Sequence, residues 1–543
     1  MPRLREASFR AAAIACALVV GGGCGGGGAG PRPGGTLTIA QRDSFATFDP
    51  AFAWNPEDSP YLDLVFEGLV GFDDAGLVRP ACAAHTTVSR DGLTYRFELR
   101  PRLKYADGSP LEAKDFVYGL ARLFRPGAQR SPGAPQFAAI AGALGRSARN
   151  VVPLAIEAPD ARTVVIRLAW ADPHLLEKLA QPRYAIPVPQ GAAERLGVSY
   201  GAFPSTNGPY RLVRSGPGVL LFVRNPHYDP GITDPLAARA ARGYADTLRV
   251  LSHRTGRQTL LGLESGRVDL ACPPPLEYGE RIARSPVLGT VRATTDPPIR
   301  WLLALNTELY PLARRDVRRA VAWGVNRQRL IEQFGTIMLP ARGFAVTEEA
   351  AGQAPGYDPV LARQYLEAAK NYTGIRLAVS VPRASLAATA LDALTPGLAR
   401  ASIQVDGVLL PTPEWGAAVI ARRGISAAIV PWQAPSRDDL DGLASMLLNR
   451  GLGPEWGGNL AWYHPGSDLD SLLVRGLRDP DPVARRAVSE RIGTLLESDL
   501  PLVPLARIEQ VVIHRVAWSG VRIHPRLGLD LRRIYRRRGA PTS

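Results

Sequence analysis

Apolar and polar residues follow two different periods along this 543-residue chain, which predicts both strands and helices. A two-residue alternation covers residues 95–99, and the tight-turn dipeptide Asp91-Gly92 precedes it, so we expect a hairpin over residues 88–105. A second alternating run covers residues 164–168, and residues 36–39 form a short apolar run. These three segments predict strands in the first third of the chain.

Helical periodicity dominates other parts of the sequence. Residues 316–334 place apolar side chains at every fourth position, which predicts one amphipathic helix. Asp358-Pro359 and Asp481-Pro482 each put a capping aspartate before a proline at the first helical position. Apolar strands return within residues 502–513. Because strands and helices interleave throughout, the expected fold class is α/β, and an all-β fold or a helix bundle is excluded.

The amino terminus has the pattern of an export signal. A segment with three arginines precedes the apolar residues 11–20, and three glycines at 21–23 precede Cys24. The apolar run is too short to span a bilayer. It resembles a bacterial lipoprotein signal, with Gly21 where leucine is usual. We expect residues 1–23 to be removed, Cys24 to be lipidated and the Gly-rich residues 24–35 to form a flexible tether.

The net charge of +15 does not by itself indicate a nucleic-acid partner. Of the 65 basic residues only four are lysines, and the arginines are spread along the chain. This skew, with abundant Ala, Gly and Pro, is more typical of a compositional bias than of a surface that binds polyanions. The dense run within residues 532–538 is a basic tail. We therefore predict no nucleic-acid binding.

Cysteine and histidine give no support for a metal site. Apart from Cys16 and Cys24, the chain has Cys82 and Cys272, which could form one disulfide or remain two buried thiols, and we favour thiols. No CxxC or HxxxH pattern occurs. We expect neither a metal nor a cofactor.

One enzyme motif occurs, and its context argues against it. Residues 197–201 match GxSxG, the nucleophile elbow of serine hydrolases, which needs a strand before the serine and a helix after it. Here residues 190–196 have a helical pattern instead. No lysine follows a glycine, so a Walker A loop is excluded. We expect a protein that is not an enzyme.

Several motifs occur in one order along the chain. Residues 61–70, with the core Phe-Glu-Gly-Leu-Val, resemble a signature of the family 5 extracytoplasmic solute-binding proteins, the oligopeptide, dipeptide and nickel-chelate receptors of ABC importers. Residues 89–116 resemble the most specific block of that family. Further similar segments lie at 207–210, 224–228, 263–269, 306–327, 357–359 and 500–505.

The resemblance implies two lobes that are joined by a hinge and close over a ligand. It places a discontinuous first lobe at residues 36–255 plus 497–543, with an extra subdomain at about 80–185, and the second lobe at 256–496. Closure is physically reasonable for a receptor, because a ligand that contacts both lobes favours the closed state.

The implied function is that of a substrate-binding lipoprotein. It would be a monomer, anchored outside a bacterial membrane, that delivers a small solute or peptide to an ABC permease and its ATPase. The alternative is a lipid-anchored adhesion, chaperone or signalling protein that kept this fold and lost transport.

The resemblance also points to ligand-binding residues. The family's aromatic segment near the pocket matches Trp415 and Trp432, which could equally pack in the lobe core, and Trp54 is a candidate from the first lobe. The aspartate that pairs with the ligand's amino terminus in peptide receptors falls on Pro435. The nearby polar residues that could substitute are Arg437, Asp438 and Asp439, although Asp439 could instead cap the helix expected at 440–448. His85 stands where a tryptophan is usual, and we interpret it as a structural replacement.

The proline has a consequence for the ligand. A buried ammonium without a carboxylate partner loses several kcal/mol of hydration, so the pocket should disfavour free peptide amino termini. Arg437 would suit a carboxylate or another anion. The expected ligand is therefore an anionic or neutral solute, or a blocked peptide, stacked on Trp415 or Trp432. The alternative is that Asp438 or Asp439 replaces the missing acid and peptide binding survives.

Acylation of Cys24 can be tested directly. Cys24→Ser should release the protein from membranes into the soluble fraction, because the acyl chains are the proposed anchor. Cys272→Ser should leave it on the membrane. Fractionation and mass spectrometry of the mature amino terminus measure both. A wild-type protein that is soluble and unmodified would contradict the lipoprotein interpretation.

Overall fold

The fold was analysed in a computed structural model. It describes residues 31, 33–41, 45, 47–53, 55–125, 131, 133–144, 152–216, 218–253, 255–341, 343, 354–371, 373–383, 385–421, 425–448, 463 and 468–537. The expected signal peptide, Cys24, most of the tether and Trp54 lie outside the described residues.

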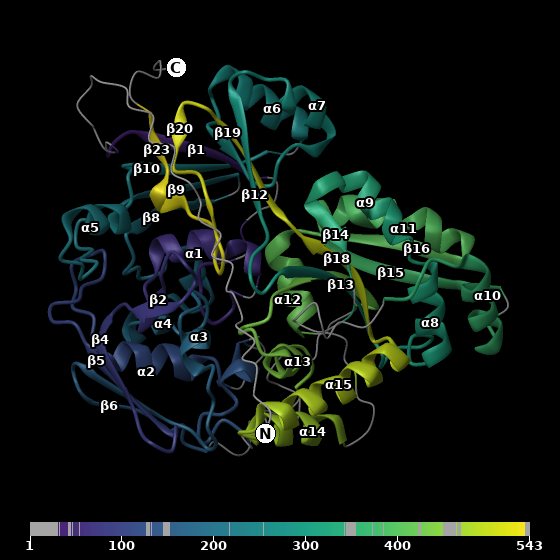
Figure 1. The fold of residues 1–543 in the computed structure, drawn as a ribbon, viewed down its shortest axis with the longest axis horizontal. Helices are drawn as coiled ribbons and strands as arrows, with labels where there is room; N and C mark the ends of the chain where they lie inside the picture. Colours follow the sequence, from purple (N-terminus) through teal and green to yellow (C-terminus); the bar gives the residue numbers. More distant parts are fainter. Residues whose placement is uncertain are drawn as a thin grey trace, which may run out of the picture.

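A seven-stranded sheet forms the framework of the first lobe (Figure 1). Its central strand, β1 (Thr36–Gln41), pairs in parallel with β10 (Thr247–Ser252) and β11 (Leu270–Ala271). The run predicted at 36–39 is therefore a strand. The outer strands are β8 (Tyr210–Gly216) and β9 (Val219–Arg224) on one side, and β12 (Leu288–Ala293) and β19 (Gln510–Arg515) on the other.

A six-stranded sheet forms the framework of the second lobe. Its central pair is β13 (Ile299–Leu305) and β17 (Ala427–Trp432). Its order is β14-β18-β13-β17-β15-β16, with β14 (Met338–Pro340), β15 (Ile375–Pro382), β16 (Ile403–Leu410) and β18 (Leu502–Ile508).

Two layers of helices cover this second sheet. Leu302 and Ala304 of β13 pack into one apolar core, whereas Leu303 and Leu305 pack into another, as alternation in a strand requires. The core of Leu302 includes side chains of α13 (Asp439–Leu447), α14 (Asp468–Arg478) and α15 (Pro482–Asp499). The core of Leu303 includes those of α8 (Arg315–Gly324), α9 (Arg327–Phe334), α10 (Pro359–Ala368) and α11 (Leu386–Arg400).

Two of the helix starts confirm the predicted caps, and one predicted helix is wrong. The side chain of Asp358 accepts backbone N–H bonds at the start of α10, and that of Asp481 does so at the start of α15. The single helix expected at 316–334 is broken into α8 and α9. Val325, in an extended conformation, ends the first, and Asn326 caps the second, because its side chain accepts from the Arg329 N–H.

Two adjacent chain crossings join the lobes. β12 pairs with β19 in the first sheet, and β13 pairs with β18 in the second. The chain passes from β12 to β13 through residues 294–298 and returns from β18 to β19 through Glu509. Sheet membership therefore changes at these two points, whereas the sequence-based division lies at 256 and 496. We propose the crossings as the lobe boundaries.

A smaller sheet within the first half of the chain has the order β4-β5-β7-β6. β4 (Ala83–Val88) and β5 (Thr94–Leu99) form a hairpin whose turn contains Asp91-Gly92, with Gly92 at a positive φ of 69°. The turn was predicted correctly, but the first strand precedes it rather than following residue 88. β7 (Thr163–Arg167) and β6 (Ile156–Asp160) complete the sheet, and α2 (Ala113–Arg122) packs on it.

Asp269, within a matched family segment, fastens the first sheet to the returning chain. Its buried carboxylate accepts hydrogen bonds from the Thr38 N–H and from Trp518 Nε1, both at 2.8 Å. Burial raises the pKa of Asp269, and these two hydrogen bonds offset part of that effect.

Removing this carboxylate should destabilise the fold. Asp269→Ala leaves two buried donors without an acceptor, so the free energy of unfolding should fall by about 2–5 kcal/mol. Denaturant titration measures it. Glu490→Ala, which removes only an exposed ion pair with Arg486, is the control and should change stability by less than about 1 kcal/mol. Equal effects would contradict the assigned role.

Candidate functional site

The segment that follows β17, residues 433–437, contacts the first crossing between the lobes. Gln433 donates from Nε2 to the Pro297 carbonyl at 2.9 Å, and Arg437 pairs with Asp296 at 2.7 Å. Asp296 and Pro297 belong to the first crossing between the lobes. The Arg437 and Asp296 side chains are each 54% exposed, so a charged solute can reach this pair. Arg437, a predicted site residue, thus lies at the hinge side of the interlobe contact.

Pro435 faces an arginine of the first lobe. Arg526, in the chain segment after β19, donates from Nη2 to the Pro435 carbonyl at 3.3 Å and to Glu177 Oε2 at 2.9 Å. Its guanidinium is 2% exposed and lies over the Phe72 ring at 4.9 Å. Burial lowers the pKa of Arg526, and attraction to Glu177 opposes that shift. The Pro435 carbonyl therefore has a buried Arg526–Glu177 ion pair beside it.

Asp438 caps the helix that follows, and Asp439 does not. The Asp438 Oδ1 atom accepts from the N–H groups of Leu440 and Asp441, and Oδ2 contacts Arg485 at 3.1 Å. The alternative that Asp439 is the cap is wrong, because α13 begins one residue earlier than expected. Asp439 lies close enough to Arg300 to raise its pKa, although burial and Arg507 together lower that pKa to about 10.

A buried charge network adjoins this segment. Asp441, in the first turn of α13, contacts Lys178 Nζ at 2.9 Å, and Lys178 also contacts Asp172 at 2.8 Å. His174 Nδ1 lies 3.1 Å from the second oxygen of Asp441, which also accepts from Ser436 Oγ at 2.7 Å. Lys178 follows β7 in the first lobe, whereas Asp441 belongs to the second. This is therefore a contact between lobes.

Burial and the neighbouring charges shift the pKa values of these groups in opposite directions. Burial would raise the pKa of Asp441, but Lys178 and the hydrogen bond from His174 hold it well below its usual range. Burial would lower the pKa of Lys178, and the two aspartates raise it instead. Desolvation also opposes the charge on His174, yet Asp441 raises its pKa. Lys178 and Arg485 face three carboxylates, so protonation of His174 neutralises the network.

The same network is the one described group that could hold a metal by composition. Asp172, His174 and Asp441 place ligand atoms within 4.8 Å of one another. However, the Lys178 ammonium already lies between the two carboxylates. The lysine supplies the positive charge that a metal would bring, so the donor set does not fit a metal ion.

The predicted tryptophans lie in a core. Trp432 is 7% and Trp415 is 3% exposed, and both belong to the apolar cluster that spans the second lobe and the smaller sheet. Trp432 donates from Nε1 to Ser445 Oγ at 3.3 Å. Contact with a ligand stays a prediction for both. Trp54, the third candidate, lies outside the described residues.

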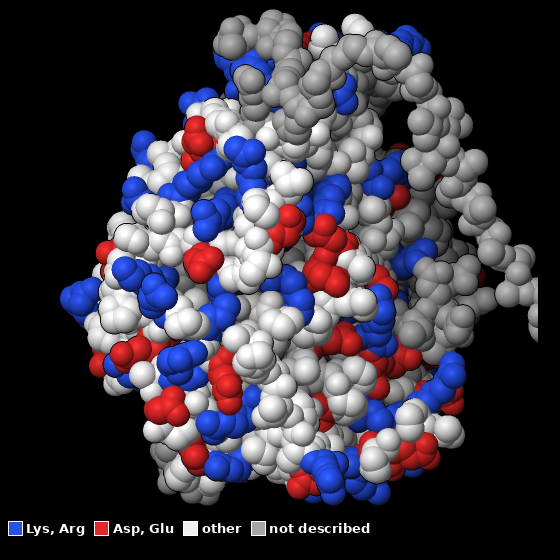
Figure 2. Space-filling view, turned by 60° about the vertical axis from the view of Figure 1, so that its left-hand side comes forward, with Lys and Arg blue, Asp and Glu red and all other residues white. Residues whose placement is uncertain are grey.

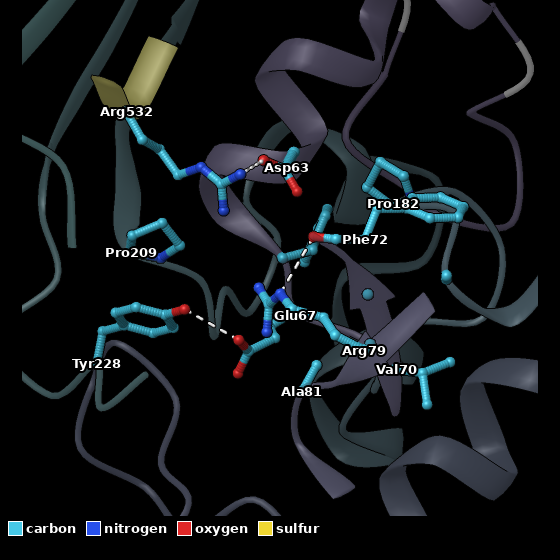
Figure 3. A pocket seen from close by; sticks show the side chains of 14 residues that line it. Asp63, Glu67, Val70, Phe72, Arg79, Ala81, Pro182, Pro209, Tyr228 and Arg532 are labelled. Atoms are coloured by element: carbon cyan, nitrogen blue, oxygen red, sulfur yellow. Dashed lines mark hydrogen bonds and ion pairs between the residues drawn. The ribbon is translucent and has the colours of Figure 1, made fainter. Parts of the chain in front are cut away.

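The family-like segments of the first lobe converge on Glu67 (Figure 3). Its carboxylate accepts from Tyr228 at 2.9 Å and pairs with Arg100 at 2.8 Å, while its backbone exchanges hydrogen bonds with the Asn207 side chain. The adjoining cavity, lined also by Arg79 and Arg532, has a volume of about 20 Å³. That volume holds a single water, so the cavity has no room for a solute, and the hydrogen bonds of Glu67 tie the segments of the lobe together.

Other features limit the possible functions. Ser199 lies in a 3₁₀ helix, Gly197–Ala202, that follows α4 (Gln190–Leu196), which is the wrong context for a nucleophile elbow. Within the described residues Cys82 and Cys272 are free thiols, and Cys272 is only partly buried. Figure 2 shows basic and acidic side chains interspersed over the face it presents. Among the described helices, none is long and apolar enough to cross a membrane.

Sequence reasoning missed Lys178, Asp441 and Arg526. Asp441 had one usable signal, an acid among the apolar residues of the helix expected at 440–448. Lys178 had another, as one of only four lysines in an arginine-rich chain. Neither signal identifies the partner, because 263 residues separate the two.

Comparisons with known proteins agree with this architecture. The sequence pattern of the bacterial extracellular solute-binding proteins, family 5, matches residues 78–449. The glutathione-binding protein GsiB of Escherichia coli K12 is 24% identical over 506 residues, covering 91% of this chain and 93% of GsiB.

Solved structures show the same fold. The periplasmic binding protein DppA of Helicobacter pylori, in complex with the peptide STSA, has a TM-score of 0.77 at 19% identity, covering 93% of this chain and 98% of DppA. AgaA of A. tumefaciens R10, in complex with agropinic acid, has a TM-score of 0.75 at 20% identity, covering 93% and 99%. This chain therefore belongs to the family 5 bacterial extracellular solute-binding proteins, the solute-binding components of ABC importers.

Proposed function

We propose that this chain is a lipid-anchored receptor that captures a small solute between its lobes and delivers it to an ABC permease. Membership of the family and the two-lobed fold support capture, and the two chain crossings support closure about a hinge. The export signal and Cys24 support the anchor. Delivery to a permease follows from the family alone.

The proposed ligand is an anionic or neutral solute, or a peptide without a free amino terminus. The observation that carries this proposal is the pairing of the Pro435 carbonyl with Arg526. A ligand ammonium at this position would meet the Arg526 guanidinium, whose partner Glu177 is already engaged. Since an amine would have to displace that guanidinium from Glu177, a free amine is disfavoured there.

The nearby acids support the same ligand class. Asp438 is engaged by the α13 backbone and by Arg485, and Asp441 is engaged by Lys178. An amine would have to compete with these internal cations. Arg526 Nε, in contrast, is buried and has no acceptor among the described residues, and Arg437 is half exposed. Both are donors suited to a carboxylate.

The relatives allow this range of chemistry. GsiB is named for glutathione, DppA is in complex with a peptide and AgaA with agropinic acid. A fold that accommodates such different solutes leaves ligand choice to individual residues in the cleft. For this chain we propose that Arg437 and Arg526 make that choice.

Ligand class can be measured by calorimetry on protein stripped of ligand by unfolding and refolding. The panel contains tri- to pentapeptides, their amino-acetylated forms, glutathione and small dicarboxylates. Acetylated or anionic compounds should bind at least tenfold more tightly than their free-amine counterparts, a difference of about 1.4 kcal/mol.

Arg437→Gln should weaken anionic ligands by about tenfold or more, since it removes a charge-assisted donor. Arg486→Gln, on the exposed face of α15, is the matched control and should have no effect. Micromolar binding of free-amine peptides that is lost on acetylation would overturn the ligand class.

Closure gives an independent measurement. Ligand binding should reduce the radius of gyration in X-ray scattering, because it shifts the open molecules of the ligand-free protein to the closed form. It should also stabilise the fold by about 2.7 kcal/mol at a ligand concentration 100-fold above the Kd. Binding without compaction would contradict the two-lobe mechanism.

A further inference from the structure

The contact between the lobes at Lys178 and Asp441 is dry and charged. Lys178 is 4% and Asp441 is 1% exposed, and their direct contact leaves no room for a separating water. The adjoining cavity, which both lobes line, has a volume of only about 10 Å³. A ligand does not fit there, so this contact belongs to the protein and not to its solute.

Each lobe keeps its own half of the network. On the first lobe Lys178 is held by Asp172 at 2.8 Å. On the second, Asp441 accepts from Ser436 at 2.7 Å and lies 3.8 Å from Arg485. Both charges therefore retain a partner when the lobes separate, so neither is left alone in the open state. The Lys178–Asp441 and His174–Asp441 contacts are the ones that opening breaks.

A second contact accompanies the ion pair. The Arg478 guanidinium of α14 lies 4.9 Å from the centre of the Trp170 ring, and Trp170 follows β7 in the first lobe. Trp170 and Leu477 line the same small cavity as Lys178 and Asp441. The residues that follow β7 in the first lobe and the helices of the second lobe thus meet through a desolvated patch with complementary charges at its centre.

We propose that Lys178 is an internal ammonium that fastens the closed lobes by inserting between Asp172 of the first lobe and Asp441 of the second. The Lys178–Asp441 pair forms only where the two lobes meet, so its attraction favours the closed state, while Asp172 and Arg485 keep either charge from being left alone in the open state. The chain thereby supplies from its own sequence the positive charge that Asp441 contacts on closing. Lys178 is a positioning residue that sets the balance between open and closed forms. It acts whatever the charge of the ligand.

The lysine content allows a clean test in the full-length protein without added ligand. The chain has only Lys104, Lys114, Lys178 and Lys370, so acetylation by an N-hydroxysuccinimide ester can be followed residue by residue in a mass spectrometer. Lys114, whose side chain is 74% exposed, is the internal reference. Lys178 should react at least tenfold more slowly than Lys114. In Asp441→Asn, Lys178 should react at least tenfold faster than in the wild type, with the Lys114 rate unchanged.

Scattering separates lobe opening from local loosening. Lys178→Met keeps the length of the side chain and removes its charge, so the radius of gyration without ligand should increase toward that of an open form. Lys114→Met is the matched control and should leave it unchanged. A thermal melt of each variant establishes that the lobes themselves remain folded.

Two results would overturn the proposal. One is a Lys178 that reacts as fast as Lys114 in the wild type, or at the same rate in Asp441→Asn. The other is a folded Lys178→Met with the radius of gyration of the wild type. Neither measurement needs a ligand, so both outcomes are independent of the proposed ligand class.

Discussion

The two chain crossings at the centre of the molecule constrain everything else. One crossing connects β12 to β13, and the other connects β18 to β19. On the first-lobe side β12 pairs with β19, and on the second-lobe side β13 pairs with β18. The lobes are therefore joined by one two-stranded ribbon, which permits rotation at residues 294–298 and Glu509 and resists sliding. Because the returning strand must lie beside the first, the carboxyl-terminal segment has to rejoin the first lobe. That return carries Arg526 to Pro435.

Rotation about such a ribbon separates side chains that meet from different lobes, such as Lys178 and Asp441. We propose this ion pair as the fastening of the closed form, and the half-exposed Arg437 beside the first crossing as a contact for the ligand.

The features that sequence predicts well are those that depend on neighbours in the chain. Asp358 and Asp481 cap helices because the donors lie two or three residues away, and Asp91-Gly92 forms a turn for the same reason. The break between Gly324 and Arg327 was missed because the apolar pattern continues across it, while Val325 turns to an extended conformation and Asn326 caps a new helix. Charge pairs such as Lys178 with Asp441 depend on the closed fold, and no local pattern encodes them.

The resemblance to a family also predicts the fold better than the ligand, for a physical reason. The segments that carry it place Glu67, Asn207, Tyr228 and Asp269 inside the first lobe, where each forms hydrogen bonds with other buried polar groups of this chain. Such residues determine how the lobe folds and give no information about the identity of the solute. We propose that ligand choice depends instead on the position where the chain departs from the peptide-receptor pattern. At Pro435 a side-chain carboxylate is missing and the carbonyl contacts Arg526, which is paired with Glu177, so a free ligand amine finds no unengaged carboxylate there.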